Sequence, residues 1–172
     1  MLTQTPCFTR EEPTQFVDGP IEGIIATRLT HHEDDRGWLV EVFRSDELPE
    51  ELFPAMTYVS QTLPGTTRGP HEHSEQTDLF AFLGDGRWVI WLWDVRRDSP
   101  TWGYRQRIDV QAGQYLRLLV PPGVVHAYRN VGNHPACVLN AANRLYAGEN
   151  RESEIDEIRH EQRVDSPFLL DD

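Results

Sequence analysis

Short apolar segments separated by turn-forming residues run through most of this chain. The breaks between them contain the Gly, Pro, Asp and Asn residues that tight turns require, as in residues 84–86, 98–100 and 121–123. Many short strands at this spacing are typical of antiparallel sandwiches and jelly-roll barrels. The pattern therefore predicts an all-β fold, with strands at residues 21–31, 38–43, 57–63, 79–83, 88–95, 105–110, 115–119, 124–131 and 136–145.

Helix is expected in only two short segments. Residues 45–53 begin with the N-cap candidates Ser45 and Asp46, and residues 152–163 form a charged segment in which Ile155 and Ile158 share one helical face. No internal repeat or low-complexity linker interrupts the chain. We therefore expect one domain over residues 1–172, with an N-terminal arm over about 1–20 and a charged helix or tail over about 150–172.

The acidic balance of the chain excludes several classes of function. The 172 residues carry 28 acidic and 16 basic side chains, a net charge of −12, and every basic side chain is Arg. Without Lys the chain has no Schiff-base or P-loop lysine, and its negative charge argues against binding to nucleic acids or anionic membranes. The spacing of Cys7 and Cys137 supports neither a disulfide framework nor a zinc ribbon.

Targeting signals are missing from the sequence pattern. The first residues, MLTQTPCFTREEPTQF, lack the apolar core of a signal peptide. No apolar run approaches the roughly 18 residues that a membrane helix requires. A cytoplasmic protein that binds a small molecule is the expectation.

Three histidines have an informative spacing. His71 and His73 are two residues apart, so both imidazoles point to the same face if this segment is extended. His126 follows a Pro-Pro-Gly turn and begins a strand-like segment. In a β-barrel the three side chains would project into one interior, and we expect a shared cavity there.

At these positions the chain resembles the cupin superfamily. The motif P-x-G-x-x-H-x-x-x-N is matched at every fixed position from Pro121 to Asn130, and H-x-H, an acid and Gly84 match a second motif more loosely. The resemblance implies a jelly-roll, or double-stranded β-helix, barrel with few short helices. It also implies an alternative in which divalent Fe, Mn, Ni or Zn is bound, because neutral imidazoles plus a carboxylate suit these ions. The implied ligands are His71, His73, Glu75, Asp78 and His126.

Longer motifs resemble the dTDP-4-dehydrorhamnose 3,5-epimerase family of cupins. These are D-D-R-G-W at residues 34–38, R-G-P-H at 68–71, D-V-R-R-D-S-P-T-W-G at 94–103 and P-x-G-x-x-H at 121–126. A related branch, the dTDP-4-keto sugar 3,4-ketoisomerases, carries R-G-x-H-x-H, and this chain has both histidines of that pattern. The resemblance implies a nucleotide-activated 4-keto sugar as substrate, no cofactor, and a homodimer that exchanges N-terminal strands.

The same resemblance implies an isomerase that abstracts a proton α to the ketone. His71 matches the family's base, which must have a pKa near neutral pH and lie within hydrogen-bond reach of the C–H group. Arg36 and Arg68 match positions that contact substrate, and the planar guanidinium offers paired donors to a diphosphate. His73, Gln76 and His126 are further candidates for substrate binding.

The chain departs from the family at two places, and a third position matches it only poorly. Leu139 occupies the position of the general-acid Tyr, so we consider Tyr128 and Tyr146 as substitutes. Asp78 occupies the position of a Lys, which suits either a metal-bound site or an ion pair with a nearby Arg. Asp165 is the best match to an acid that orients the base, although it also suits a cap beside a helix.

Three functions therefore stay open from the sequence. The first is the metal-free isomerase with His71 as base. The second is a metal-dependent cupin enzyme that uses the three histidines and a carboxylate. The third is a catalytically silent sugar-binding cupin, since a fold alone does not imply activity.

Overall fold

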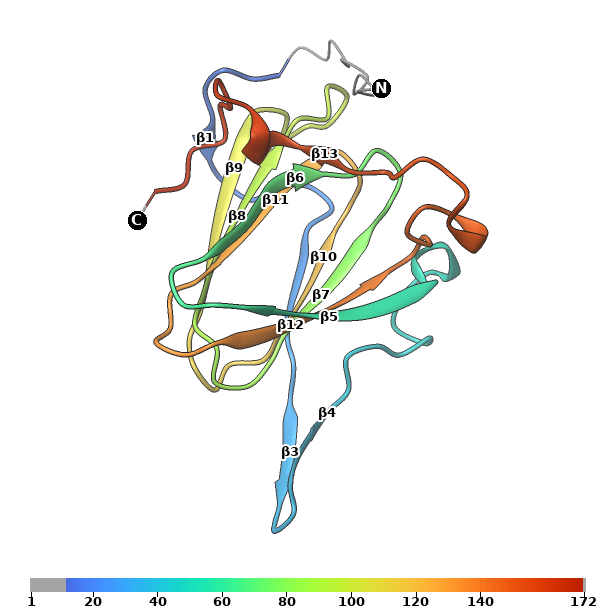
Figure 1. The fold of residues 1–172 in the computed structure, drawn as a ribbon, viewed down its shortest axis with the longest axis vertical. Coiled ribbons are helices and arrows are strands. Elements are labelled where there is room, and N and C mark those ends of the chain that lie inside the picture. The colour runs from blue at the N-terminus through green and yellow to red at the C-terminus, as the bar shows by residue number, and fades with distance from the viewer. Residues whose placement is uncertain (1–11, 172) are drawn as a thin grey trace.

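The structure is a computed structural model that describes residues 12–171, and it is built almost entirely of β-strands (Figure 1). Two sheets carry most of the strands. The first sheet contains, in spatial order, β1 (Val17–Asp18), β9 (Tyr104–Val110), β8 (Trp88–Asp94), β11 (Val124–Asn130), β6 (Thr67–Glu72) and β13 (Ile158–Arg159). The second contains β2 (Ile25–Arg28), β10 (Leu116–Val120), β7 (Asp78–Phe82), β12 (Ala136–Ala142) and β5 (Met56–Thr62). This architecture confirms the predicted all-β fold.

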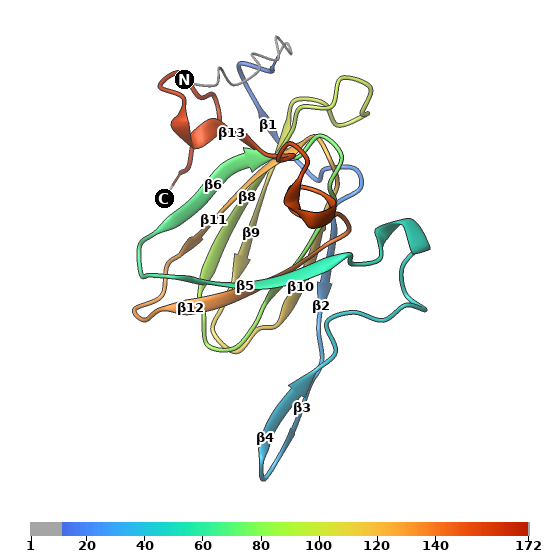
Figure 2. The ribbon, with the colours of Figure 1, turned by 45° about the vertical axis from the view of Figure 1, so that its right-hand side comes forward.

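A hairpin of β3 (His31–Asp34) and β4 (Gly37–Val40) projects away from the two sheets in both views (Figures 1 and 2). Its position means that residues at its tip lie outside the barrel of their own chain. Trp38 and Leu39 on this hairpin are 51% and 61% exposed, so it carries apolar surface into solvent.

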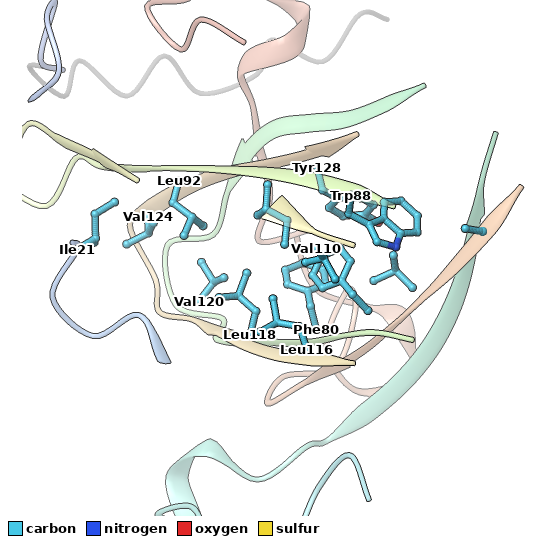
Figure 3. Close-up of a cluster of buried hydrophobic side chains, with 14 residues drawn as sticks. Ile21, Phe80, Trp88, Leu92, Val110, Leu116, Leu118, Val120, Val124 and Tyr128 are labelled. Carbon is cyan, nitrogen blue, oxygen red and sulfur yellow. The ribbon is translucent and has the colours of Figure 1, made fainter. Parts of the chain in front are cut away.

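The main core lies between the two sheets (Figure 3). Inward-facing side chains of the first sheet, such as Ile90 and Leu92, meet those of the second, such as Phe80 and Leu118. The alternate residues of β8 point outward and pack under the C-terminal tail, where Trp93 contacts Phe168. Strand β8 is therefore buried on both faces, which explains its continuous apolar sequence.

The predicted strands from residue 57 onward agree with the structure, and six of them match within one residue at both ends. The predicted strand at 21–31 is shorter than expected, since only Ile25–Arg28 pairs before the hairpin begins. The prediction missed β6, which contains Pro70 and which the pattern of apolar residues did not mark. Most of the expected N-terminal arm, namely residues 1–11, lies outside the described part of the chain. In the part of the arm that is described, Val17–Asp18 pairs with β9.

The predicted surface helix at 152–163 is wrong. Residues Glu149–Arg151 and His160–Gln162 form 3-10 turns, and Ile158–Arg159 forms β13 on the edge of β6. A single pair of apolar residues gave too little helical amphipathicity to compete with pairing to an open sheet edge. Within 45–53 only Glu50–Leu52 forms a 3-10 turn.

Across residues 12–171, none of the helices has the length and apolar character that crossing a bilayer requires.

Candidate functional site

The three predicted histidines meet at one place in the barrel. His71 on β6 and His126 on β11 are direct partners in the antiparallel register, and their ring centroids are 4.4 Å apart. His73 follows the end of β6, with its ring 5.8 Å from His71 and 5.9 Å from His126. One ring nitrogen from each histidine lies within 4.8 Å of the others. The three imidazoles therefore lie together, as their spacing predicts.

Gly69 allows β6 to approach β11 closely at this point. Its φ of +81° lies in the left-handed region that favours glycine, and a Cβ atom there would lie 2.5 Å from the carbonyl oxygen of His126. The Gly of the R-G-x-H motif therefore holds the two histidine-bearing strands together.

Asp78 brings a buried carboxylate to the histidines from the opposite sheet. Its side chain is 1% exposed, with Oδ2 lying 3.1 Å from His73 Nε2 and 3.4 Å from His126 Nε2. Oδ1 accepts hydrogen bonds of 2.8 Å from Gln76 Nε2 and from Asn140 Nδ2. The carboxylate is thus surrounded by polar groups, which a buried charge requires.

His73 and Asp78 form an ion pair at neutral pH. Burial works against the charge of His73, but the attraction of Asp78 outweighs it and raises the pKa of His73 to about 9. Burial likewise opposes the charge of Asp78, yet its contacts with His73, His126 and Asn140 lower the pKa of this carboxyl to about 2. Protonated His73 therefore supplies a fixed positive charge beside the other two imidazoles.

His71 is neutral at the same pH. Burial, followed by repulsion from His126 and His73, lowers the pKa of His71 well below its ordinary value. Burial also lowers the pKa of His126, whose Nδ1 lies 3.1 Å from the Val124 carbonyl oxygen as a donor. The histidine cluster therefore combines one imidazolium with two neutral rings, and a neutral imidazole can accept a proton.

Asp156, in the tail before β13, fixes the segment that carries His73. Its carboxylate accepts the backbone N–H groups of Ser74, Glu75 and Gln76 at 2.7, 2.9 and 2.9 Å. Its own carbonyl oxygen contacts His73 Nδ1. The sequence offered no signal for this residue, because the contact joins positions about eighty residues apart.

Arg68 and Tyr128 lie in the same barrel. Arg68 is exposed and donates from Nε to Thr62 Oγ1 at 2.9 Å and from Nη2 to the Gln61 carbonyl at 2.7 Å. Tyr128 is buried in the main core, and its hydroxyl lies 3.3 Å from Ser60 Oγ. Tyr146 is half exposed in the loop after β12, with its backbone N–H on Met56 Sδ.

Several predicted site residues lie elsewhere in this chain. The carboxylate of Glu75 points outward to Arg144, 3.2 Å away, and contributes nothing to the cluster. Asp165 is 86% exposed and lies 3.6 Å from Arg163, so it forms a surface ion pair instead of orienting His71. The carboxylate beside the histidines is Asp78, which the sequence had placed at a Lys position.

Arg36 stands at the tip of the projecting hairpin and not in the barrel of its own chain (Figures 1 and 2). Its guanidinium is 89% exposed and is paired with Asp34 of the same turn.

Leu139 and Asn140 on β12 point to opposite faces of their sheet, because side chains alternate along a strand. Leu139 lies outside the main core, whereas Asn140 points inward to Asp78.

The D-x-R-x-x-S-P-T motif forms a turn beside the barrel. Asp94 is fully buried and accepts hydrogen bonds from Arg96, Ser99 and Thr101 at 2.6 to 2.8 Å from their side chains. These polar residues therefore satisfy one another within the turn. The longest motif of the sequence fixes the fold near β8 and contributes no group to the histidine cluster.

Comparison with known proteins places these features in a family. The family model described as dTDP-4-dehydrorhamnose 3,5-epimerase matches residues 18–161. A probable low-salt glycan biosynthesis epimerase of Haloferax volcanii is 36% identical over 127 residues, which are 73% of this chain and 81% of that protein. The spore coat polysaccharide biosynthesis protein SpsL of Bacillus subtilis is 34% identical over 119 residues, covering 69% and 78%.

The fold is shared with solved structures of the same kind. A dTDP sugar isomerase from Desulfovibrio desulfuricans superposes with a TM-score of 0.73 at 26% sequence identity, covering 87% of this chain and 91% of that one.

Proposed function

The chain belongs to the dTDP-4-dehydrorhamnose 3,5-epimerase family, and we propose that it inverts a carbon next to the ketone of a dTDP-4-keto sugar. The observation that carries this proposal is the meeting of His71, His73 and His126 beside the buried Asp78. The enzyme is an isomerase of nucleotide sugars used in polysaccharide biosynthesis, as its relatives' names indicate.

His71 is the base of the proposed reaction. The neutral ring accepts the proton from C3 or C5, the two carbons α to the C4 ketone, and an enolate forms. Its low pKa keeps it unprotonated at neutral pH, so it does not need to lose a proton before it acts. Pairing of His71 with His126 across β6 and β11 fixes the backbone that carries the ring.

His73 supplies the positive charge that the enolate requires. The family resemblance leads us to expect a Lys at the position of Asp78, and this carboxylate instead keeps His73 protonated. An imidazolium held in a buried site stabilises developing negative charge without reorganisation during the reaction. The His73 imidazolium therefore takes the place of the expected Lys cation, from a position five residues earlier in the chain.

Arg68 and Gln76 bind the substrate in this proposal, and Arg36 completes the site from a second copy. Arg68 is exposed beside the cavity, where its guanidinium suits a diphosphate. The hairpin that carries Arg36 cannot reach the histidines of its own chain, but exchange of this hairpin in a homodimer would bring it to a neighbour. The same exchange would bury Trp38 and Leu39.

The test is hydrogen exchange at the carbons next to the ketone. Wild-type protein incubated with a dTDP-4-keto sugar in D₂O should introduce deuterium at C3 or C5, measured by NMR and mass spectrometry. His71→Asn should slow this exchange by about 10²- to 10⁴-fold, the contribution of a positioned base. His134→Asn, an exposed histidine in a turn, is the matched control and should exchange as the wild type does. Exchange by neither protein with any such sugar would reject the proposal in favour of a silent sugar-binding cupin.

A bound divalent metal is the second candidate, favoured by the 4.8 Å grouping of the three histidine nitrogens. The donor set fits the ion, since His126 Nε2 and Asp78 Oδ2 are buried without a hydrogen-bond partner. His71, His73 and His126 would hold it, and it would act as a Lewis acid at the sugar carbonyl. Stoichiometric metal that is lost in His126→Ala, with activity lost on chelation, would favour this candidate. Full activity after chelation is expected for the metal-free epimerase.

We also propose that the 172 residues form one cupin domain that works in the cytoplasm without a cofactor. Analytical ultracentrifugation tests whether the protein is the proposed homodimer with exchanged β3–β4 hairpins. A monomer with full activity would refute that exchange.

A further inference from the structure

Tyr58 brings a phenol to the histidine cavity from a strand that no motif marked. It lies on β5 and pairs in register with Asn140 of β12. By strand alternation it shares a face with Ser60, whose hydroxyl meets Tyr128, and with Thr62, whose hydroxyl meets Arg68. Tyr58 therefore points into the barrel, and since it is 46% exposed a bound sugar can reach it.

Tyr58 and His71 lie on strands of different sheets, β5 and β6. Tyr58 is six residues before Pro64 and His71 is six residues after Gly65, so both lie equally far from the turn that joins β5 to β6. These two strands belong to different sheets, and Figure 1 shows them diverging from their turn. A sugar ring bound between them would present one face to the imidazole and the other to the phenol.

The hydrogen bonds around Tyr58 leave its proton available. Asn140 Nδ2 donates to the phenol oxygen at 2.9 Å and also to Asp78 Oδ1 at 2.8 Å. The oxygen acts as an acceptor in this contact, so its own O–H group can point to the substrate. Burial is the main cause that raises the pKa of Tyr58 to about 12, which keeps the phenol protonated at neutral pH.

The two phenols that the sequence suggested are less well placed. Tyr128 is 5% exposed and is enclosed by the main core beside Phe82 and Trp88. Tyr146 lies in a loop and not on the barrel wall. Strand β12, which carries Leu139 in place of the expected Tyr, is the direct neighbour of β5.

We infer that Tyr58 is the proton donor of the epimerisation, an inference that rests on the function proposed above. In the first step the C–H bond next to the ketone breaks, and His71 takes the proton as the enolate forms. In the second step the Tyr58 O–H bond breaks and a new C–H bond forms on the opposite face of the sugar. Water returns a proton to the phenolate, which Asn140 stabilises meanwhile, and His71 releases its own to water. The reaction therefore consumes no proton and needs no further reagent.

The experiment separates the two steps in a Tyr58→Phe variant. Deuterium in recovered substrate reports proton abstraction by His71, and inverted product reports donation from the opposite face. We expect Tyr58→Phe to lose product formation by at least about 10²-fold while it still exchanges deuterium into the substrate. Tyr104→Phe is the matched control, because this partly exposed phenol lies on β9, two strands away from β11 in the sheet, and it should behave as the wild type.

Three results would overturn the inference. They are product formation by Tyr58→Phe within a few-fold of wild type, loss of exchange together with product, and loss of product in Tyr128→Phe or Tyr146→Phe alone. If Tyr58→Phe does not fold, 3-fluorotyrosine at position 58 lowers the pKa of the phenol, and the alkaline limit of product formation should move to lower pH. A wild-type protein that performs neither step would refute the proposed function itself, so the two failures are distinguishable.

Discussion

Asp78→Asn removes the charge that keeps His73 protonated, and its effect can be worked out from the ion pair. The pKa of His73 lies at about 9 in the folded protein, against an ordinary value of 6.5. That difference corresponds to about 3 kcal/mol of stability when His73 is charged, at 1.36 kcal/mol for each pH unit. Only 11% of the His73 side chain is exposed, so solvent screens the pair little.

The sign of the pH dependence follows from the direction of the shift. Because the pKa of His73 is raised by folding, its stabilisation is complete below pH 6.5 and is lost as the pH rises through about 9. The pKa of Asp78 is lowered to about 2, so its stabilisation is present above 3.8 and is lost as the pH falls through about 2. Asp78→Asn should remove about 3 kcal/mol of unfolding free energy at pH 6 and much less at pH 10.

Two measurements check this prediction. NMR titration of the His73 ring should give a pKa near 9 in the wild type and below 6.5 in Asp78→Asn, where burial acts without the opposing carboxylate. Urea denaturation at several pH values gives the unfolding free energies. Burial lowers the pKa of His71 and of His126, so neither ring should titrate between pH 6.5 and pH 9, where the His73 titration is followed.

Glu75→Gln is the control, because this neighbouring carboxylate points outward to Arg144 and should leave the His73 titration unchanged. A wild-type His73 that titrates near 6.5, or an Asp78→Asn variant that still titrates near 9, would refute the reasoning.

Three further variants test the supports of the site. Asp156→Ala removes the acceptor of three backbone N–H groups and should lower the unfolding free energy by roughly 2 kcal/mol or more in urea titrations, with a fall in deuterium exchange; an unchanged midpoint would contradict the proposed clamp. Gly69→Ala places a Cβ atom against the His126 carbonyl and should weaken exchange by His71 more than Gly84→Ala, a glycine with open space around it; equal effects would exclude close strand approach as the reason for Gly69. Asp94→Ala leaves Arg96 without its buried partner and should cost about 3–5 kcal/mol by thermal and urea unfolding, whereas a cost below about 1 kcal/mol would show that the turn is held by other contacts.

The strands of the barrel were predictable because their information is local. Apolar alternation and turn residues repeat within a few positions, and six of the predicted strands match the structure within one residue at both ends. The exceptions depend on distant partners. Strand β6 contains Pro70 and little apolar sequence, and it exists because β11 and β13 pair with it. Within the tail, Ile158–Arg159 is a strand for the same reason, since it pairs with β6.

The histidine cluster was predictable in part. The two-residue spacing of His71 and His73 and the turn before His126 indicated one interior, since strands alternate their faces with a period of two. The charge of each ring could not be read from that spacing. It depends on burial and on Asp78, which reaches the histidines from the other sheet.

By itself, the sequence determined the strand pattern, the family and the three imidazoles, because each of these is written in the order and spacing of neighbouring residues. Only the tertiary structure decided that His73 is paired with Asp78 and that Asp156 holds the segment between them. These contacts join residues on separate sheets or in the C-terminal tail, and their strength depends on the exclusion of water from the space where they meet.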